Sequence, residues 1–313
     1  MSTTRLITVI CWAISAVALL GLVIWFIVST PVNFMFNFET GPFESVETHH
    51  VPVDGITSLQ IANWTSGAVT VTTHDGSDIQ ITEFARGTLQ DDDKLRLTIE
   101  EGAITINFTR RTAPRSNMPS KQLEVLVPYA YADRFESLIA NTTSGRINVT
   151  GVSADDFSAR TTSGNIVLRD IVSENLSVMA TSGAVEVFGI YSPQINLQTV
   201  SGRVVAADTQ AQSLTTTTTS GRHELSGSFE NVNARSTSGR VEVTSTVVPE
   251  SLNARTTSGN ITVTVPDNAE PISVRYSVTS GRFTSAIPVV THSADAQFNL
   301  NVTSGRISIY ELR

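Results

Sequence analysis

The sequence predicts an all-β fold, a parallel β-solenoid built from coils of about 19 residues, and two observations predict it. The dipeptide Ser-Gly recurs at a nearly constant step, and apolar residues alternate with polar ones on both sides of each pair. A regular period of this size is typical of proteins in which short coils stack. Alternation with a period of two is typical of strands with one buried face. We expect a right-handed coil, because crossovers between parallel strands are nearly always right-handed.

The Ser-Gly pairs set the length of each coil. They begin with Ser144-Gly145 and recur four times at a step of 19 residues, to Ser220-Gly221; the next steps are 18, 20, 22 and 24, and an outlying copy stands at Ser66-Gly67. Glycine accepts a positive φ without steric cost, which suits a tight turn. We therefore assign a structural role in the turn to nine glycines: Gly145, Gly164, Gly183, Gly202, Gly221, Gly239, Gly259, Gly281 and Gly305.

The residues around each turn predict its two strands. The residue six positions before the Ser is apolar in all nine regular coils. The residue three positions after the Ser is apolar in all but one coil, where it is His223, which we interpret as a core histidine. One coil cannot bury these side chains alone, so stacked coils must share a continuous core.

The front of the chain predicts a membrane anchor. Residues 6–28 carry no charge and are rich in aliphatic side chains, which is long enough to span a bilayer. Arg5 is the only basic residue before them, so we expect residues 1–5 in the cytoplasm and the rest of the chain outside, as in a single-pass protein of the cell membrane. A cleaved signal peptide is the alternative, although its apolar core is usually shorter. The only cysteine, Cys11, lies in this segment and excludes an intramolecular disulfide.

Two further segments precede the regular coils. Residues 29–57 contain several Pro and Gly and are expected to form an extracytoplasmic linker. Residues 58–136 are rich in alternating strand patterns that do not follow the period of the coils, and the run Asp91-Asp92-Asp93 reads as a solvated loop. We interpret them as an irregular β cap of the solenoid, since terminal repeats are commonly atypical, with a separate small β domain as the alternative. Residues 137–313 hold the regular repeats.

Charge gives one candidate binding feature. The net charge is −8, from 21 Lys and Arg against 29 Asp and Glu, and no basic block occurs, so nucleic acid is not an expected partner. The residue after the Gly is Arg in six coils, and a row of outward guanidinium groups suits a repeating anionic polymer. The alternative is that these arginines pair with acids on neighbouring coils, such as Glu186, Glu224 and Glu242. The candidate polymer-binding row is Arg146, Arg203, Arg222, Arg240, Arg282 and Arg306.

We find no candidate catalytic, cofactor-binding or metal-binding residues in the sequence. A polysaccharide-degrading β-helix enzyme needs clustered carboxylates, yet the acids do not recur at one position of the repeat. The best local pair, Asp155-Asp156, is explained by a solvated turn. His49-His50 lacks a third ligand at useful spacing. We therefore expect a protein that is not an enzyme and holds no cofactor.

The repeat resembles one bacterial family. The pattern Thr-Thr-Ser-Gly-(Arg/Asn)-Ile-x-Val, as in residues 142–149 and 256–263, is similar to the "putative adhesin" family, a domain of unknown function in exported or membrane-anchored envelope proteins. The run Leu-Glu-Val-Leu-Val-Pro at 123–128 also looks like that family. The likeness covers residues of about 58 to 313. It implies a solenoid and an envelope location, and it carries no catalytic residues over to this chain.

These observations together predict a non-enzymatic envelope-surface protein, an adhesin or binding platform for anionic cell-envelope polymer or polysaccharide. The alternatives are a structural scaffold or envelope-stress signalling accessory that acts through protein partners, and the polysaccharide-degrading enzyme. The last strand, at 307–310, has no later segment to cover it, so we expect an open C-terminal edge through which two copies could associate.

Overall fold

The computed structural model describes residues 41–111, 118–266, 271–291 and 294–312, and within these ranges the chain is all-β. The only helical elements in these ranges are two three-residue 3-10 turns, η1 (Asp91–Asp93) and η2 (Tyr129–Tyr131). No helix in these ranges has the length and apolarity that a bilayer crossing requires. The predicted anchor at residues 6–28 lies outside the described residues.

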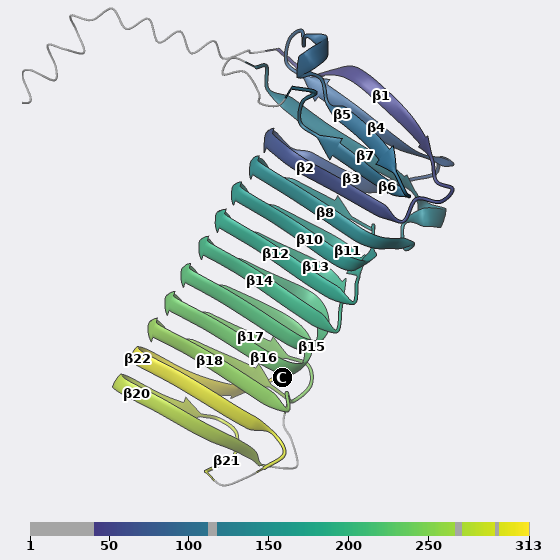
Figure 1. Ribbon diagram of the computed structural model, residues 1–313. Coiled ribbons are helices and arrows are strands. Elements are labelled where there is room, and N and C mark those ends of the chain that lie inside the picture. Colours follow the sequence, from purple (N-terminus) through teal and green to yellow (C-terminus); the bar gives the residue numbers. More distant parts are fainter. Residues whose placement is uncertain (1–40, 112–117, 267–270, 292–293, 313) are drawn as a thin grey trace, which may run out of the picture. The chain divides into compact units, whose positions relative to one another are not determined.

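The strands that precede each Ser-Gly turn stack in one parallel column, with Ser opposite Ser on neighbouring coils (Figure 1). In stacking order the column contains β6 (Ala103–Asn107), β2 (Ser58–Ser66), β8 (Phe135–Ser144), β10 (Ala154–Ser163), β12 (Asn175–Ser182), β14 (Gln194–Ser201), β15 (Val204–Ser220), β16 (His223–Ser238), β18 (Ser251–Ser258), β22 (Gln297–Glu311) and β20 (Ile272–Ser285).

The strands that follow the turn form a second parallel column. It contains β7 (Lys121–Pro128), β3 (Val69–His74), β9 (Ile147–Thr150), β11 (Ile166–Val172), β13 (Val185–Tyr191), the first halves of β15 and β16, β17 (Val241–Ser245), β19 (Ile261–Val265) and the last parts of β22 and β20. Between the columns lies one continuous apolar core that runs from Val51 to Ile309. This arrangement confirms the predicted all-β, solenoid-like fold.

The turn glycines are required by close packing between coils as much as by backbone freedom. Six of the nine have φ between 144° and 157°. A Cβ on Gly164 would overlap the carbonyl oxygen of Gly145 on the neighbouring coil, and the same overlap recurs from coil to coil, with Gly145 meeting Gly67. The glycines therefore form one column in which each backbone lies where a side chain would be. The outlying Ser66-Gly67 pair belongs to this column.

The cap breaks the parallel pattern. β1 (Glu44–Pro52) pairs antiparallel with β4 (Asp78–Ala85), β4 pairs antiparallel with β7, and β5 (Arg96–Glu100) pairs antiparallel with β6. The expectation that residues 29–57 form a linker is therefore wrong for Glu44–Pro52, which forms a strand of the sheet. The reason is that its partner β4 offers a complete ladder from Asp78 to Ala85.

The coils do not stack in chain order at either end. β6 and β7 lie outside the coil of β2 and β3, although they come later in the chain. At the other end β22 lies between β18 and β20. The expected open edge on the final strand is therefore wrong, because β22 has a hydrogen-bonded neighbour on each side. The outermost strand is β20, and β21 (Val289–Val290) covers only its first two residues, Ile272 and Ser273.

Candidate functional site

The six predicted arginines lie on the outer side of the Ser-Gly turns, and all six side chains are exposed. Neighbouring coils are joined here by backbone bonds: Val185 N–H donates to the carbonyl of Arg203, Val204 to Arg222 and His223 to Arg240. Three arginines therefore stand on consecutive coils. At the spacing of adjacent strands, roughly 4.8 Å, their backbones form a continuous column.

The other three arginines complete the column less regularly. Arg282 and Arg306 are in register on the two last coils, since β20 and β22 pair at these residues. Arg146 is separated from Arg203 by two coils, which carry Asn165 and Ala184 at the same position. The structure thus brings together one group of three arginines and one of two, and leaves Arg146 apart.

Acidic side chains neutralise part of this arginine column. Arg203 donates from Nε to Glu186 Oε1 at 3.0 Å, and Arg222 Nη1 lies 3.1 Å from Glu224 Oε1. The hydrogen bond that Arg203 donates to Glu186, together with the negative charge of this carboxylate, raises the pKa of Arg203 above its ordinary value. Within the described ranges, Arg240 has no ion pair, and the same holds for Arg146, Arg282 and Arg306. The predicted pairing with an acid of a neighbouring coil holds for Arg203, whereas Glu224 belongs to the same coil as Arg222.

A shallow groove lies on the other side of the turns. It measures about 420 Å³ and crosses the coils of β8, β10, β12, β14 and β15. Its walls include Arg160 and the exposed Thr162, Thr181 and Thr219, which directly precede the Ser of their coils. The turn edge therefore offers hydroxyl groups on one side and guanidinium groups on the other.

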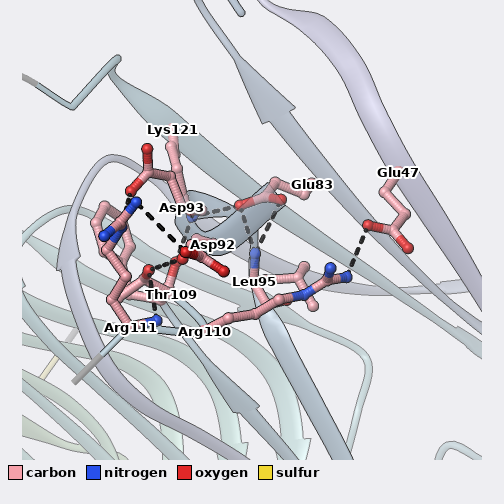
Figure 2. Close-up of polar contacts among 10 residues, drawn as sticks. Glu47, Glu83, Asp92, Asp93, Leu95, Thr109, Arg110, Arg111 and Lys121 are labelled. Atoms are coloured by element: carbon pink, nitrogen blue, oxygen red, sulfur yellow. Dashed lines mark hydrogen bonds and ion pairs between the residues drawn. The ribbon is translucent and has the colours of Figure 1, made fainter. Parts of the chain in front are cut away.

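A second group of charged residues lies in the cap, and it was not predicted from the sequence. Lys121 and Glu83 form an ion pair in which both side chains are fully buried. Both carboxylate oxygens of Glu83 accept from the N–H of Leu95, at 3.1 and 3.0 Å. Lys121 Nζ donates to the carbonyl of Asp93 at 2.9 Å and to the carbonyl of Phe108. Figure 2 shows these contacts.

Burial lowers the pKa of Lys121, while the charge of Glu83 acts in the opposite direction. The ammonium group also lies 4.2 Å from the centre of the Phe108 ring, a cation–π contact. One sequence signal for this site existed. Lys121 begins the alternation that continues with Leu123, Val125 and Val127, and so occupies a core-facing position of its strand.

Two arginines of the cap, Arg110 and Arg111, connect the buried group around Lys121 and Glu83 to the surface. Arg111 Nε donates to Asp93 Oδ1 at 2.7 Å, and Arg110 donates from Nε to the carbonyl of Leu95 and from Nη2 to Glu47, both at 3.2 Å (Figure 2). The side chain of Asp93 is fully buried. The prediction of a solvated loop at Asp91-Asp92-Asp93 is therefore wrong for Asp93, because Arg111 compensates its charge.

The remaining polar candidates do not assemble into a catalytic or metal site in the described part of the chain. Asp155 and Asp156 are exposed at the start of β10, where Asp156 accepts from Asn175 at 2.9 Å. His50 Nδ1 contacts Asp78 at 2.5 Å. Across the described ranges, no three His, Cys, Asp or Glu side chains are grouped so that they could hold a metal ion.

Comparison with known proteins gives a family and a fold. The family model described as Toastrack DUF4097 matches residues 56–310. A "putative adhesin" from Parabacteroides distasonis ATCC 8503 is similar with a TM-score of 0.56 and 10% identity over 86% of this chain and 98% of that chain. A "putative adhesin" from Parabacteroides merdae ATCC 43184 is similar with a TM-score of 0.54 and 12% identity, over 86% of this chain and 97% of that chain. At these identities the likeness concerns the fold alone. No curated protein matches.

Proposed function

We propose that this chain, which belongs to the Toastrack DUF4097 family, is a non-enzymatic binding protein of a bacterial cell envelope that holds an anionic polymer along its Ser-Gly turns. The observation that carries the proposal is the stacking of Arg203, Arg222 and Arg240 on three consecutive coils. Guanidinium groups bind carboxylate and phosphate oxygens through paired hydrogen bonds. A column of them suits a ligand whose charges also repeat.

The charge balance of the column supports this reading. Arg240 is exposed and has no acidic partner in the described part of the chain, so its guanidinium is open to a ligand. Glu186 and Glu224 hold Arg203 and Arg222 in place on one side, and each guanidinium keeps further N–H donors. The threonine hydroxyls of the adjacent groove favour a polymer that also carries hydroxyl groups, such as an acidic polysaccharide.

We further propose that residues 6–28 anchor the protein in the cell membrane, with the N-terminus in the cytoplasm and the solenoid outside. The uncharged length of this segment supports the location. Two solved structures of similar fold are described as "putative adhesin", and we propose an adhesive role for this chain as well. In this reading the protein attaches the membrane surface to a polymer of the envelope.

The test measures binding of the full-length chain, purified in mild detergent, to polygalacturonate, a carboxylate polymer, with neutral dextran as the reference. The variant replaces Arg203, Arg222 and Arg240 with Gln. We expect binding to weaken about ten- to thirtyfold, because three exposed contacts each contribute about 1 kcal/mol or less. Added salt should weaken wild-type binding, since exposed charges are screened.

A matched control replaces Arg235, Arg255 and Arg275 with Gln. These three arginines are exposed on the strands that precede the Ser of their coils and do not line the groove, so the change in net charge is the same. Polymer binding that is equal in the two triple variants, with unchanged thermal melting, would refute the proposed site. Equal affinity for dextran and polygalacturonate would refute an anionic ligand.

A second candidate function is assembly through the outer edge of β20. In the described residues β21 covers only Ile272 and Ser273 of this strand, and unpaired strand edges promote pairing with another chain. Tyr276 is half-exposed and stacks on Phe283 at 4.1 Å at this end of the core. Sedimentation of the full-length chain over a range of concentrations tests it: a species that stays monomeric at the highest concentration excludes assembly.

A further inference from the structure

The surface of the cap contains a concavity with a strongly basic lining. It measures about 470 Å³, and its walls include Arg96, Arg110 and Arg111 together with Asn63 and Asn107. Among the described residues, none that lines it is acidic. A neighbouring concavity of about 460 Å³ shares Arg96 and Arg110. Three arginines therefore line one hollow in a chain whose net charge is −8.

Two of these arginines are held by neighbouring groups, and Arg111 also lies 3.5 Å from a carboxylate oxygen of Asp92. Arg110 is bound by the carbonyl of Leu95 and by Glu47, and Arg111 is bound by the buried carboxylate of Asp93 (Figure 2). Each of these contacts uses part of the five N–H donors of a guanidinium, so donors remain for a ligand. A group oriented before binding loses less conformational entropy when the ligand arrives.

The third arginine supplies the uncompensated charge. Arg96 is exposed at the start of β5 and has no acidic partner in the described ranges. It lies in the lining of both concavities. An anion that enters would therefore meet one free guanidinium and two that are already positioned.

The backbone at the rim of the concavity bends at a bulge. Asn63 has φ of 54°, in the left-handed region, and the register of β2 against β8 shifts between Ile61 and Trp64. This bulge directs the Asn63 amide to Asn107 Oδ1 at 3.3 Å, at the rim of the concavity. It also places Trp64 in the core, edge-on to Phe108. Bulges and strained non-glycine residues are concentrated near functional sites.

We infer that this concavity is a binding site for an oxyanion group, phosphate or carboxylate, carried by a sugar-sized ligand. Guanidinium groups and amides are the donors that recognise such oxygens, and the volume lies in the range of small-molecule pockets. The site lies on the cap, away from the arginine column, and does not depend on the proposed polymer binding. Its ligand is small, so the two sites can be tested separately.

The test is calorimetric titration of the full-length chain in mild detergent, at low salt, with inorganic phosphate, glucose 6-phosphate, glucuronate and glucose. We expect glucose 6-phosphate or glucuronate to bind and glucose not to bind. Binding by the phosphate compounds alone identifies a phosphate site, and binding by glucuronate identifies a carboxylate site. If no anion binds at millimolar concentration, or glucose binds equally well, the inference is wrong.

Two variants locate the site without disturbing the fold. Arg96→Gln removes the free charge, and we expect the Kd for the bound anion to rise about tenfold or more. Asn63→Gly removes the amide and suits the positive φ, so the Kd should rise severalfold while thermal melting stays equal or increases. Arg255→Gln is the control with the same loss of charge on an exposed coil position. Affinity that is unchanged in Arg96→Gln would overturn the assignment.

Discussion

His223→Val should stabilise the protein, and the gain should grow as the pH falls. His223 is fully buried in the ladder between Val204 and Val241, and neither ring nitrogen has a hydrogen-bond partner. Burial lowers the pKa of His223 to about 4. A weaker interaction with the backbone of Arg235 acts in the opposite direction, without reaching hydrogen-bond geometry. Valine restores the side chain that the neighbouring coils carry at this position.

The magnitude has two parts. Burying the unpaired ring nitrogens of His223 costs about 1–3 kcal/mol of the free energy of unfolding. We expect valine to recover about 1 kcal/mol of this cost near pH 7.5, because the smaller side chain leaves a gap that offsets the rest. The second part depends on pH. The pKa of His223 is about 6.5 when unfolded and about 4 when folded, so the wild type loses stability as the pH falls from 6.5 towards 4. At about 1.36 kcal/mol per pH unit this loss reaches about 3 kcal/mol, and the variant escapes it.

The assay is urea denaturation followed by circular dichroism, at several pH values between 8 and 4, for wild type and variant. Carboxylates titrate equally in both proteins, so the difference in free energy of unfolding isolates His223. Thr216→Val is a matched control. Thr216 is also fully buried with an unpaired hydroxyl, so its gain should be similar at pH 7.5 and independent of pH. A difference between His223→Val and wild type that stays constant from pH 8 to pH 4 would refute the reasoning.

Two further substitutions test the packing of the coils and of the cap. Gly202→Ala places a Cβ against the carbonyl oxygen of Gly183, so we expect the free energy of unfolding, measured by urea denaturation, to fall by about 1–3 kcal/mol or more. The control Gly41→Ala has no atom within 4 Å of the new Cβ and should change this free energy by less than about 0.5 kcal/mol. Equal effects of the two substitutions would show that the coils can separate at the turn. Lys121→Met leaves the buried Glu83 without its partner and should cost about 3–5 kcal/mol, while adding Glu83→Leu should recover most of that loss; a double variant as unstable as the single one would contradict this account of the buried pair.

The sequence predicts the regular coils well because one rule decides each of their positions. Inward positions are apolar and outward positions are polar, so Val204 and Arg203 could each be assigned to a side of the strand from the alternation alone. The same rule brings Arg203, Arg222 and Arg240 into one column once the coils stack. The pairing of Arg203 with Glu186 depends on side-chain conformation, which the period does not determine.

The order of the coils could not be predicted, because every coil carries the same pattern and fits any neighbour. The coil that contains Ser304 pairs with the coil of Ser258, and the coil of Ser280 carries a pattern that would fit this position equally well. Only the longer steps of 22 and 24 residues hint at a connection that passes over a coil. In the cap, Asp93 and Lys121 lie far apart in sequence from their partners Arg111 and Glu83, so local patterns could not reveal the buried network.

The position of β22 between two other coils determines how the protein resists mechanical load. A pull on the carboxyl end cannot peel this strand away one hydrogen bond at a time, because ladders to β18 and β19 on one side and to β20 on the other hold it along its length. Both ladders must be sheared together. A stack in chain order would instead expose its last strand on one side and unravel from there. The inverted order makes the C-terminal segment a clamped strand that withstands tension.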